Sequence, residues 1–445
     1  MRLSTSYRQI LTISLPIMLG SAAQNLIVLT DNVFLYHKGS LEFAAIGLIG
    51  VFYLAISTIG YGISKGGQII IARRYGEGAY SEVGRSFYAM IALELIVASL
   101  LFLFIQLLSP IFFKLFIASP DIIEQCLAYI YPRSYGIFFS YIGLGFIALY
   151  TGLAKTKFII YDTLLLATVN LVLNYVLIFG KYGAPEMGIT GAAWASTTAE
   201  ILAFIAFVIY MIYDRSNRKF ELFKIPKFDS LLVKQVWKIS SPIVAQSVIG
   251  IGSWFLFFSW IENKSQRDLE VSNLIRNVYL MLSIPCWGFA SSINTIVSNF
   301  IGNGRLSAVL PMINKTTKIN VLFTLMIALP VILLPEIFLY PIFGRKDMSL
   351  IQEAGDLFWV LIGILVSFCV GATYFNGLSG TGDTWMALKL QAVCAVIYVV
   401  YAYLFIKVLP YDLEVAWAGE ILYWVVLYIL SLLSIKSDSW HTIKV

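Results

Sequence analysis

The sequence predicts an all-α polytopic membrane protein with twelve transmembrane helices in two pseudo-symmetric six-helix lobes. Three observations lead to this prediction: the composition is apolar, long apolar segments recur along the chain, and one pattern of residues occurs in both halves. Of the 445 residues, 59% are hydrophobic and 13% are charged, whereas soluble domains carry about 25% charged residues. Long apolar runs also argue against a transmembrane β-barrel, whose strands are short and alternate in polarity.

Each predicted helix is long enough to cross a bilayer, for which about 20 apolar residues suffice. Short loops containing Gly, Pro or charged residues separate the helices. Several helices exceed the thickness of the bilayer, so we expect them to tilt, bend or project beyond it. The twelve predicted spans are 9–36, 43–71, 86–109, 124–152, 158–180, 188–213, 231–261, 267–300, 309–334, 350–379, 385–409 and 413–435.

A basic segment, 214–230, divides the chain into an N-lobe (1–213) and a C-lobe (231–445). By the positive-inside rule this linker is cytoplasmic, and six spans on each side of it place both termini in the cytoplasm too. The net charge of +6 therefore reports topology rather than a nucleic-acid surface. We expect a monomer in the cytoplasmic (inner) membrane that contacts lipids and binds neither nucleic acid nor nucleotide.

The cysteines and histidines give no sign of metal chemistry. The four cysteines have no metal-ligand spacing, and the chain holds only two histidines. A zinc, iron–sulfur or haem site would need closer groups of these residues. We therefore expect no cofactor.

The two halves repeat one pattern in a constant register. Ser-x-Pro-Ile opens each half, and Gly-x-Gly closes its second helix. Because six is an even number, both halves cross the membrane in the same direction, which makes them parallel repeats, one of the plans on which transporters are built. Rocking of two such lobes about a central cleft predicts alternating access. The aligned pairs include Pro16 with Pro242, Gly62 with Gly288, Gly76 with Gly302, and Gly78 with Gly304.

One acid, Asp31, lies in the first span. A bare carboxylate in hydrocarbon costs several kcal/mol, so such a group lines a polar cavity, pairs with a partner or titrates. This favours an ion or proton site. The alternative is an acid solvated at the membrane surface, because the loop at Lys38 follows only about two turns later.

Polar and small residues on the fifth and sixth helices suggest neighbours for this acid. Asn170 and Asn174 are four residues apart and share one helical face. The sixth helix has small residues, from Gly191 to Ser196, that permit tight packing. Oxygen-rich surroundings suit Na⁺ or a protonated acid, whereas helix–helix hydrogen bonding is the alternative reading. The predicted cation-coupling residues are Asp31, Asn170, Asn174, Ala192 and Ser196, with Na⁺ as a candidate ion at all of them except Ala192.

The second lobe contains charged residues close to predicted helix ends. We expect an ionic cluster of Arg276 with Glu262 or Glu270, because a buried guanidinium is costly unless it is paired. Its role would be structural gating or substrate attraction. Three further acids at membrane depth have no assigned role: Glu94, Glu200 and Glu420.

Aromatic residues make up 15% of the chain. Many lie near span ends, as interfacial belts do. Others would line a central cleft and attract flat organic cations through apolar and cation–π contacts, although belt or packing roles are the alternative for any one of them. The predicted substrate-cleft residues are Phe34, Tyr36, Trp254, Phe257, Trp287, Glu262 and Arg276.

Six segments carry a resemblance to a known family: SLPIMLGSAAQNLIVLTDNVFL, GYGISKGGQIIIARRYGEG and NYVLIFGKYGAPEMGITGAAWAS, with SSPI, SNFIGNG and SGTGDT in the second half. They resemble the MATE family of multidrug and toxic compound extrusion antiporters, within the MOP flippase superfamily. The resemblance covers nearly the whole chain. It implies twelve helices in two lobes, a V-shaped cleft, and drug export in exchange for Na⁺ or H⁺.

The DinF-like branch of that family implies a site with an Asp on helix one, an Asn-x-x-x-Asp face on helix five and a Thr on helix six. Asp31 and Asn170 match this pattern. Asn174 stands in place of the second Asp, and Ser196 in place of the Thr. The resemblance therefore leaves one carboxylate and favours one monovalent cation per cycle at this site.

The NorM-like branch implies acids on helices seven and ten, where this chain has Gly250 and Phe368. We expect a secondary antiporter, not an enzyme, that exports cationic or amphipathic organic compounds in exchange for H⁺ or Na⁺. A lipid-linked saccharide flippase of the same superfamily is the alternative, but Arg276 is nearly alone as an intramembrane cation. A membrane-embedded enzyme would need an Asp-x-x-Asp motif or a His cluster, and neither occurs.

Overall fold

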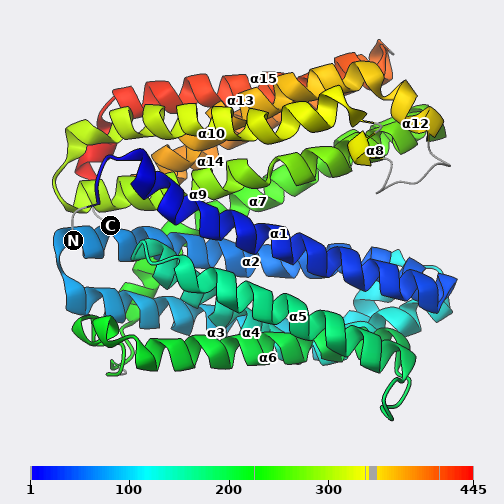
Figure 1. The fold of residues 1–445 in the computed structure, drawn as a ribbon, viewed down its shortest axis with the longest axis horizontal. Helices are drawn as coiled ribbons and strands as arrows, with labels where there is room; N and C mark the ends of the chain where they lie inside the picture. Colours follow the sequence, from blue (N-terminus) through cyan, green and yellow to red (C-terminus); the bar gives the residue numbers. More distant parts are fainter. Residues whose placement is uncertain (1–2, 225, 336, 340–347, 410, 444–445) are drawn as a thin grey trace. The chain divides into compact units, whose positions relative to one another are not determined.

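The computed structural model describes residues 3–224, 226–335, 337–339, 348–409 and 411–443. All regular secondary structure in these residues is helical (Figure 1). The longer helices are α1 (Tyr7–Lys38), α2 (Ser40–Glu77), α3 (Tyr80–Phe116), α4 (Pro120–Gly152), α5 (Lys157–Phe179), α6 (Gly188–Tyr213), α7 (Ser230–Lys264), α8 (Gln266–Leu282), α9 (Ile284–Gly302), α10 (Val309–Leu333), α13 (Gly355–Gly380), α14 (Thr384–Tyr403) and α15 (Leu413–Lys436). The short ones are η1 (Arg215–Phe220), η2 (Leu306–Ala308), α12 (Met348–Glu353), η4 (Leu404–Val408) and η5 (Ser439–Thr442).

Ten helices of the described chain are long and apolar enough to cross a membrane, and α8 with α9 forms an eleventh candidate span. α1 has 32 residues, which also exceeds the about 20 that a bilayer requires. The protein is therefore a multi-pass helical membrane protein, as its composition predicts.

The span predicted at 267–300 is not one straight helix. α8 ends at Leu282, α9 begins at Ile284, and the two are bent by 45°. Pro285 lies in the first turn of α9, where it lacks the N–H for a continuous helix and its ring clashes with the carbonyl four residues earlier. The apolar pattern runs through the bend, which is why periodicity predicted a single helix. The span predicted at 350–379 likewise divides into α12 and α13.

The described residues form two compact units: Leu19–Val244, here the N-terminal unit, and Met1–Met18 with Ala245–Val445, here the C-terminal unit. The predicted lobes divide at the basic linker, whereas these units divide inside α1 and α7, close to Pro16 and Pro242. The first part of each of these helices therefore belongs to the unit formed by the other half of the chain. Ser14 of α1, for example, donates a hydrogen bond of 2.7 Å to Ser292 of α9.

In the N-terminal unit, α5 packs closely on α6. A side chain at Gly191 would place its Cβ 2.7 Å from the carbonyl carbon and oxygen of Leu177. Because backbone atoms cannot move aside as a flexible side chain does, glycine allows this approach of the two helices. The approach brings the face of α5 that carries Asn170 and Asn174 onto α6.

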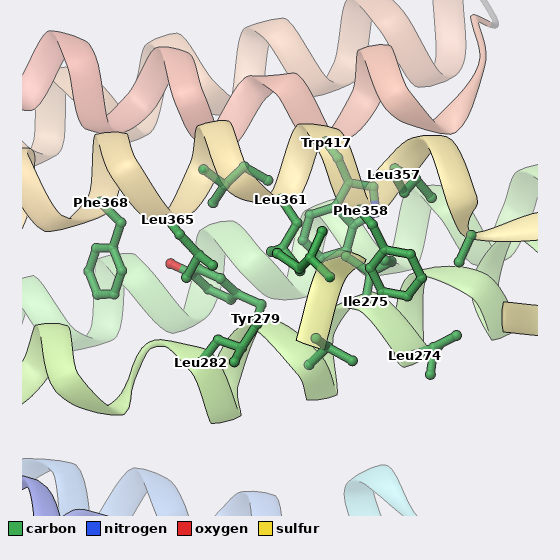
Figure 2. Close-up of a cluster of buried hydrophobic side chains, with 14 of the residues drawn as sticks. Leu274, Ile275, Tyr279, Leu282, Leu357, Phe358, Leu361, Leu365, Phe368 and Trp417 are labelled. Carbon is green, nitrogen blue, oxygen red and sulfur yellow. The ribbon is translucent and has the colours of Figure 1, made fainter. Parts of the chain in front are cut away.

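In the C-terminal unit, α13 packs in the same way on α15. A Cβ at Gly371 would lie 2.6 Å from the backbone oxygen of Trp424. Around this contact a core of large apolar side chains joins α13 to α8 and α15 (Figure 2), and it includes Tyr279, Phe368 and Trp417. Aromatic side chains of this size contribute much of the apolar area that such a core buries.

Candidate functional site

Four predicted site residues come together in the interior of the N-terminal unit. Asp31 lies on α1, Asn170 and Asn174 lie one turn apart on α5, and Ser196 lies on α6. The side-chain amide of Asn174 donates to Asp31 Oδ1 and to Asn170 Oδ1 (3.0 Å). The amide of Asn170 donates to Ser196 Oγ (2.9 Å). All four residues are buried, so one hydrogen-bonded chain links the three helices.

This chain of hydrogen bonds has an unused acceptor. Asn174 Oδ1 is buried and has no hydrogen-bond partner among the described residues, a situation that costs about 1–3 kcal/mol. Among the described residues, no group of three His, Cys, Asp or Glu side chains that could hold a metal ion occurs, and Asp31 is the carboxylate that takes part in this chain of hydrogen bonds. Carboxylate, carboxamide and hydroxyl oxygens are the ligands that hard cations prefer. The set fits Na⁺ as a transported ion, and it fits a proton on Asp31.

Ala192, also predicted for this site, offers no polar side chain. It lies one turn before Ser196 on α6, and its methyl group belongs to a hydrophobic cluster with Leu35 and Ile178. Small size at this position lets α6 pack closely against its neighbours. The structure therefore gives Ala192 a packing role behind the polar residues.

A buried ion pair borders the same site, and the sequence analysis did not identify it. Arg133 of α4 donates two hydrogen bonds to Glu200 of α6 (2.6 and 2.7 Å) and lies 4.3 Å over the ring of Tyr53. Arg133 also interacts electrostatically with Asp31. Glu200 is one turn beyond Ser196. The available signal was an Arg and a Glu, each deep in a predicted span, where charges usually pair.

Glu94, another acid without an assigned role, is fully buried on α3. It accepts a hydrogen bond from the hydroxyl of Ser64 on α2, and its Oε2 has no partner among the described residues. It is not part of the hydrogen-bonded chain at Asp31.

The predicted ionic cluster around Arg276 does not form. Arg276 lies 4.9 Å over the ring of Phe258, and none of the ion pairs in the described chain includes it. Glu262 is exposed at the end of α7, and Glu270 pairs with Arg267 (2.9 Å). An aromatic face attracts a guanidinium electrostatically, which a prediction based on opposite charges overlooks.

The five aromatic residues predicted for the cleft fall into different environments. Phe257 is fully buried in the packed core of the C-terminal unit, so it is a core residue and not a cleft residue. Phe34 is half-buried and packs on the hydrophobic cluster of the N-terminal unit. Tyr36 and Trp287 are 64% and 48% exposed, and substrate contact stays a prediction for them. Trp254 is half-buried and hydrogen-bonds to an acid.

That acid is Glu420, the third residue without an assigned role. It lies on α15 and is 4% exposed. Its Oε1 accepts a hydrogen bond of 2.7 Å from the indole N–H of Trp254 on α7. Spacing in the sequence offered no signal for this pair, because the two residues are on helices at opposite ends of the second half.

Comparison with known proteins supports the repeated architecture. The MatE family model matches residues 16–176 and again residues 242–404, so both matches begin at the prolines that open the repeat. The probable multidrug resistance protein NorM of Thermotoga maritima is 25% identical over 443 residues, which covers 98% of this chain and 93% of that protein. The protein of the same name from Pasteurella multocida is 24% identical, and the match covers 87% of this chain and 83% of that protein.

Solved structures share the fold. A MATE in complex with MaL6 superposes with a TM-score of 0.87 at 18% identity, covering 97% of this chain and 95% of the other. An outward-facing multidrug resistance MATE family transporter of the MOP superfamily gives a TM-score of 0.87 at 18% identity, with 98% and 96% covered. The predicted fold class is confirmed, and these neighbours are transporters rather than enzymes. With most of its length matched by two copies of the family model, the chain belongs to the MatE family.

Proposed function

We propose that this protein is a secondary antiporter that exports cationic or amphipathic organic compounds in exchange for H⁺ or Na⁺, by alternating access in the cytoplasmic membrane. Relatives named as multidrug resistance proteins support the substrate class. The observation that carries the coupling is the buried Asp31, which has amide and hydroxyl neighbours and no ion-pair partner among the described residues.

Asp31 is the cation acceptor in this proposal. An unneutralised carboxylate inside a membrane protein costs several kcal/mol, and binding a proton or Na⁺ removes that cost. The side-chain N–H of Asn174 donates to the carboxylate of Asp31, and the unpartnered Oδ1 of Asn174 is available to the cation. Asn170 and Ser196 fix the orientation of Asn174 through the rest of the hydrogen-bonded chain.

The neighbouring ion pair sets the charge of the site. Arg133 and Glu200 neutralise each other through two short hydrogen bonds, so Asp31 contributes the net negative charge. One monovalent cation balances that charge, which favours one cation per cycle at this site.

Exchange requires that the cation and the exported compound favour different states of the protein, because a ligand shifts an equilibrium only by its differential affinity. α1 is suited to this coupling since it carries Asp31 in the N-terminal unit and contributes its first residues to the C-terminal unit. Cation binding at Asp31 would therefore act on a helix that both units share, and the exported compound would compete with the cation for the open N-terminal unit.

Ethidium efflux from proteoliposomes tests the proposal. The purified protein would be driven in turn by an imposed Na⁺ gradient and an imposed pH gradient, with Asp31→Asn compared with wild type. Asp121→Asn, an exposed acid in the first turn of α4, is the matched control. We expect efflux under one of the gradients, abolished by Asp31→Asn and kept by the control. Full efflux in Asp31→Asn would refute Asp31 as the coupling residue, and no wild-type efflux under either gradient would refute ion-coupled export of ethidium.

A further inference from the structure

Glu420 is a buried acid that the proposed cycle does not use. It lies inside the C-terminal unit, and no described Lys, Arg or His side chain neutralises it. The indole nitrogen of Trp254 lies 2.7 Å from Oε1 of Glu420 and donates a hydrogen bond to it. Burying a carboxylate without a counter-ion costs several kcal/mol, so this position requires some other compensation.

Donor groups provide part of that compensation. The hydroxyl of Tyr398 on α14 and the indole N–H of Trp424, one turn along α15, also face the carboxylate. Neither has a hydrogen-bond partner of good geometry in the described chain, and Tyr398 is only 2% exposed. Two unpartnered donors thus converge on an acid that already accepts one hydrogen bond.

The chemistry of these donors restricts what the acid binds. An indole N–H only donates, so Trp254 and Trp424 cannot serve as ligands of a metal ion. A phenol hydroxyl donates and accepts, so Tyr398 suits both protonation states of Glu420. A proton needs no ligand shell and no space, and it is therefore the cation that this site fits.

Further aromatic rings pack around these donor groups. The ring centroid of Phe368 on α13 lies 4.4 Å from that of Trp424 and 5.8 Å from that of Tyr279 on α8. Figure 2 shows Phe368 and Tyr279 between α13 and α8. The titratable groups that face the acid are Tyr279, Tyr398 and Tyr423. Phenols in water ionise near pH 10, so near neutral pH a change of charge at this site means a proton on the acid.

We propose that Glu420 is a proton-binding site of the transport cycle, located in the C-terminal unit and separate from the cation site at Asp31. It rests on the proposed antiport function and adds a second coupling position to it. In the ionised state Trp254, Tyr398 and Trp424 orient their donors toward the carboxylate. A proton from the aqueous phase binds at Oε2, and the Tyr398 hydroxyl rotates to accept a hydrogen bond from it while Trp254 continues to donate to Oε1. Release of the proton reverses these steps.

Infrared difference spectroscopy of the purified full-length protein reads this proton directly, because the C=O stretch of a protonated carboxyl is distinct from that of a carboxylate. We expect wild type to show a carboxylic-acid band that disappears as pH rises. Glu420→Gln should lose that band and reduce pH-driven efflux several-fold, while Glu414→Gln on the same helix should keep both. Identical difference spectra for wild type and Glu420→Gln would overturn the proposal.

A second variant covers the case in which Glu420→Gln does not fold. Trp254→Phe keeps the acid and removes a donor that stabilises its ionised form. The carboxylic-acid band of this variant should therefore persist to higher pH than in wild type. Trp385 is exposed, so Trp385→Phe should leave the pH midpoint of the band unchanged. An unchanged midpoint in Trp254→Phe would overturn the role of the donors.

The two proposals fail separately. If efflux follows neither gradient but the band of Glu420 titrates, antiport of ethidium is refuted, and proton binding at Glu420 is upheld without its role in ethidium transport. If efflux depends on Asp31 and the band is absent, antiport is upheld and the proton site at Glu420 is refuted.

Discussion

The two units of this protein bury their acids in opposite environments. Asp31 in the N-terminal unit has carboxamide and hydroxyl neighbours, one of which presents an unpartnered oxygen. Glu420 in the C-terminal unit faces two indole N–H groups and a phenol. Oxygen lone pairs accept a metal cation or a proton, whereas N–H groups only hold the anion in place. Burial alone therefore does not identify the ion that an acid binds; the donors and acceptors around it do.

The units also differ in internal cations. Next to Asp31 the N-terminal unit contains Arg133, whose charge is balanced by Glu200, with side chains 8% and 12% exposed. Around Glu420 no described cation plays that part. The N-terminal site thus keeps a fixed charge pattern when its cation leaves, while the C-terminal site relies on neutral donors.

Breaking the ion pair of the N-terminal unit should give the largest effect. Arg133→Leu or Glu200→Leu leaves one buried charge unpaired, which costs about 3–5 kcal/mol of stability. The double variant leaves no unpaired charge and should recover most of that loss. Glu200→Leu also frees Arg133 to turn toward Asp31, so it should abolish ion-driven efflux.

Thermal unfolding in detergent of the two single variants and the double variant measures this coupling. Glu77→Leu is the control, because it breaks the more exposed pair with Arg74, for which only about 0–1 kcal/mol is expected. Strictly additive losses in the Arg133/Glu200 double variant would contradict a buried, mutually dependent pair.

The two acids also differ in how well their neighbours could be predicted from the sequence. Asn170 and Asn174 share a face because of helical spacing, and Asp31 stood out as an acid inside an apolar span, so their grouping was predictable once the three helices were assumed to meet. Glu420 was visible as a buried acid, but its partner Trp254 lies on another helix far away in the chain. No local spacing identifies such a contact, because it depends on which helices pack together.

In the fold, too, features set by short segments were predictable, whereas contacts between helices were not. Hydropathy and the repeated prolines predicted the spans and the two halves, since both are properties of short segments. The packing partner of Arg276 was predicted wrongly because an aromatic ring, Phe258, takes the place of a carboxylate. The bend before Pro285 was predictable in principle, because proline in a helix interior signals a break.

Two glycine substitutions perturb the packing of one unit at a time. Gly191→Ala places a Cβ against the backbone of Leu177, and Gly371→Ala places one against the backbone of Trp424. Overpacking of this kind costs about 1–3 kcal/mol. Gly191→Ala should weaken cation-driven efflux through α5 and α6 and leave the infrared band of Glu420 in place. Gly371→Ala should shift that band. Equal effects of both variants on both readouts would contradict two separate sites.

The smallest effect is expected at Asp229, an acid outside the spans. Unlike the two buried acids, it pairs with an arginine and with backbone N–H groups. Asp229 accepts hydrogen bonds from the backbone N–H groups of Leu231 and Leu232 (3.1 Å each) and from Arg85 (3.0 Å). The N–H of Leu232, with the help of Arg85 and Leu231, holds the pKa of Asp229 below its usual range. A carboxyl group with a lowered folded-state pKa adds stability above its unfolded pKa and loses it as pH falls through the folded value.

Asp229→Ala should therefore lower the melting temperature slightly at neutral pH, and the difference from wild type should narrow below about pH 4. Melting curves across that range, at low salt because exposed charges are screened, measure it. A difference independent of pH would mean that the ionised form of Asp229 is not what stabilises the start of α7.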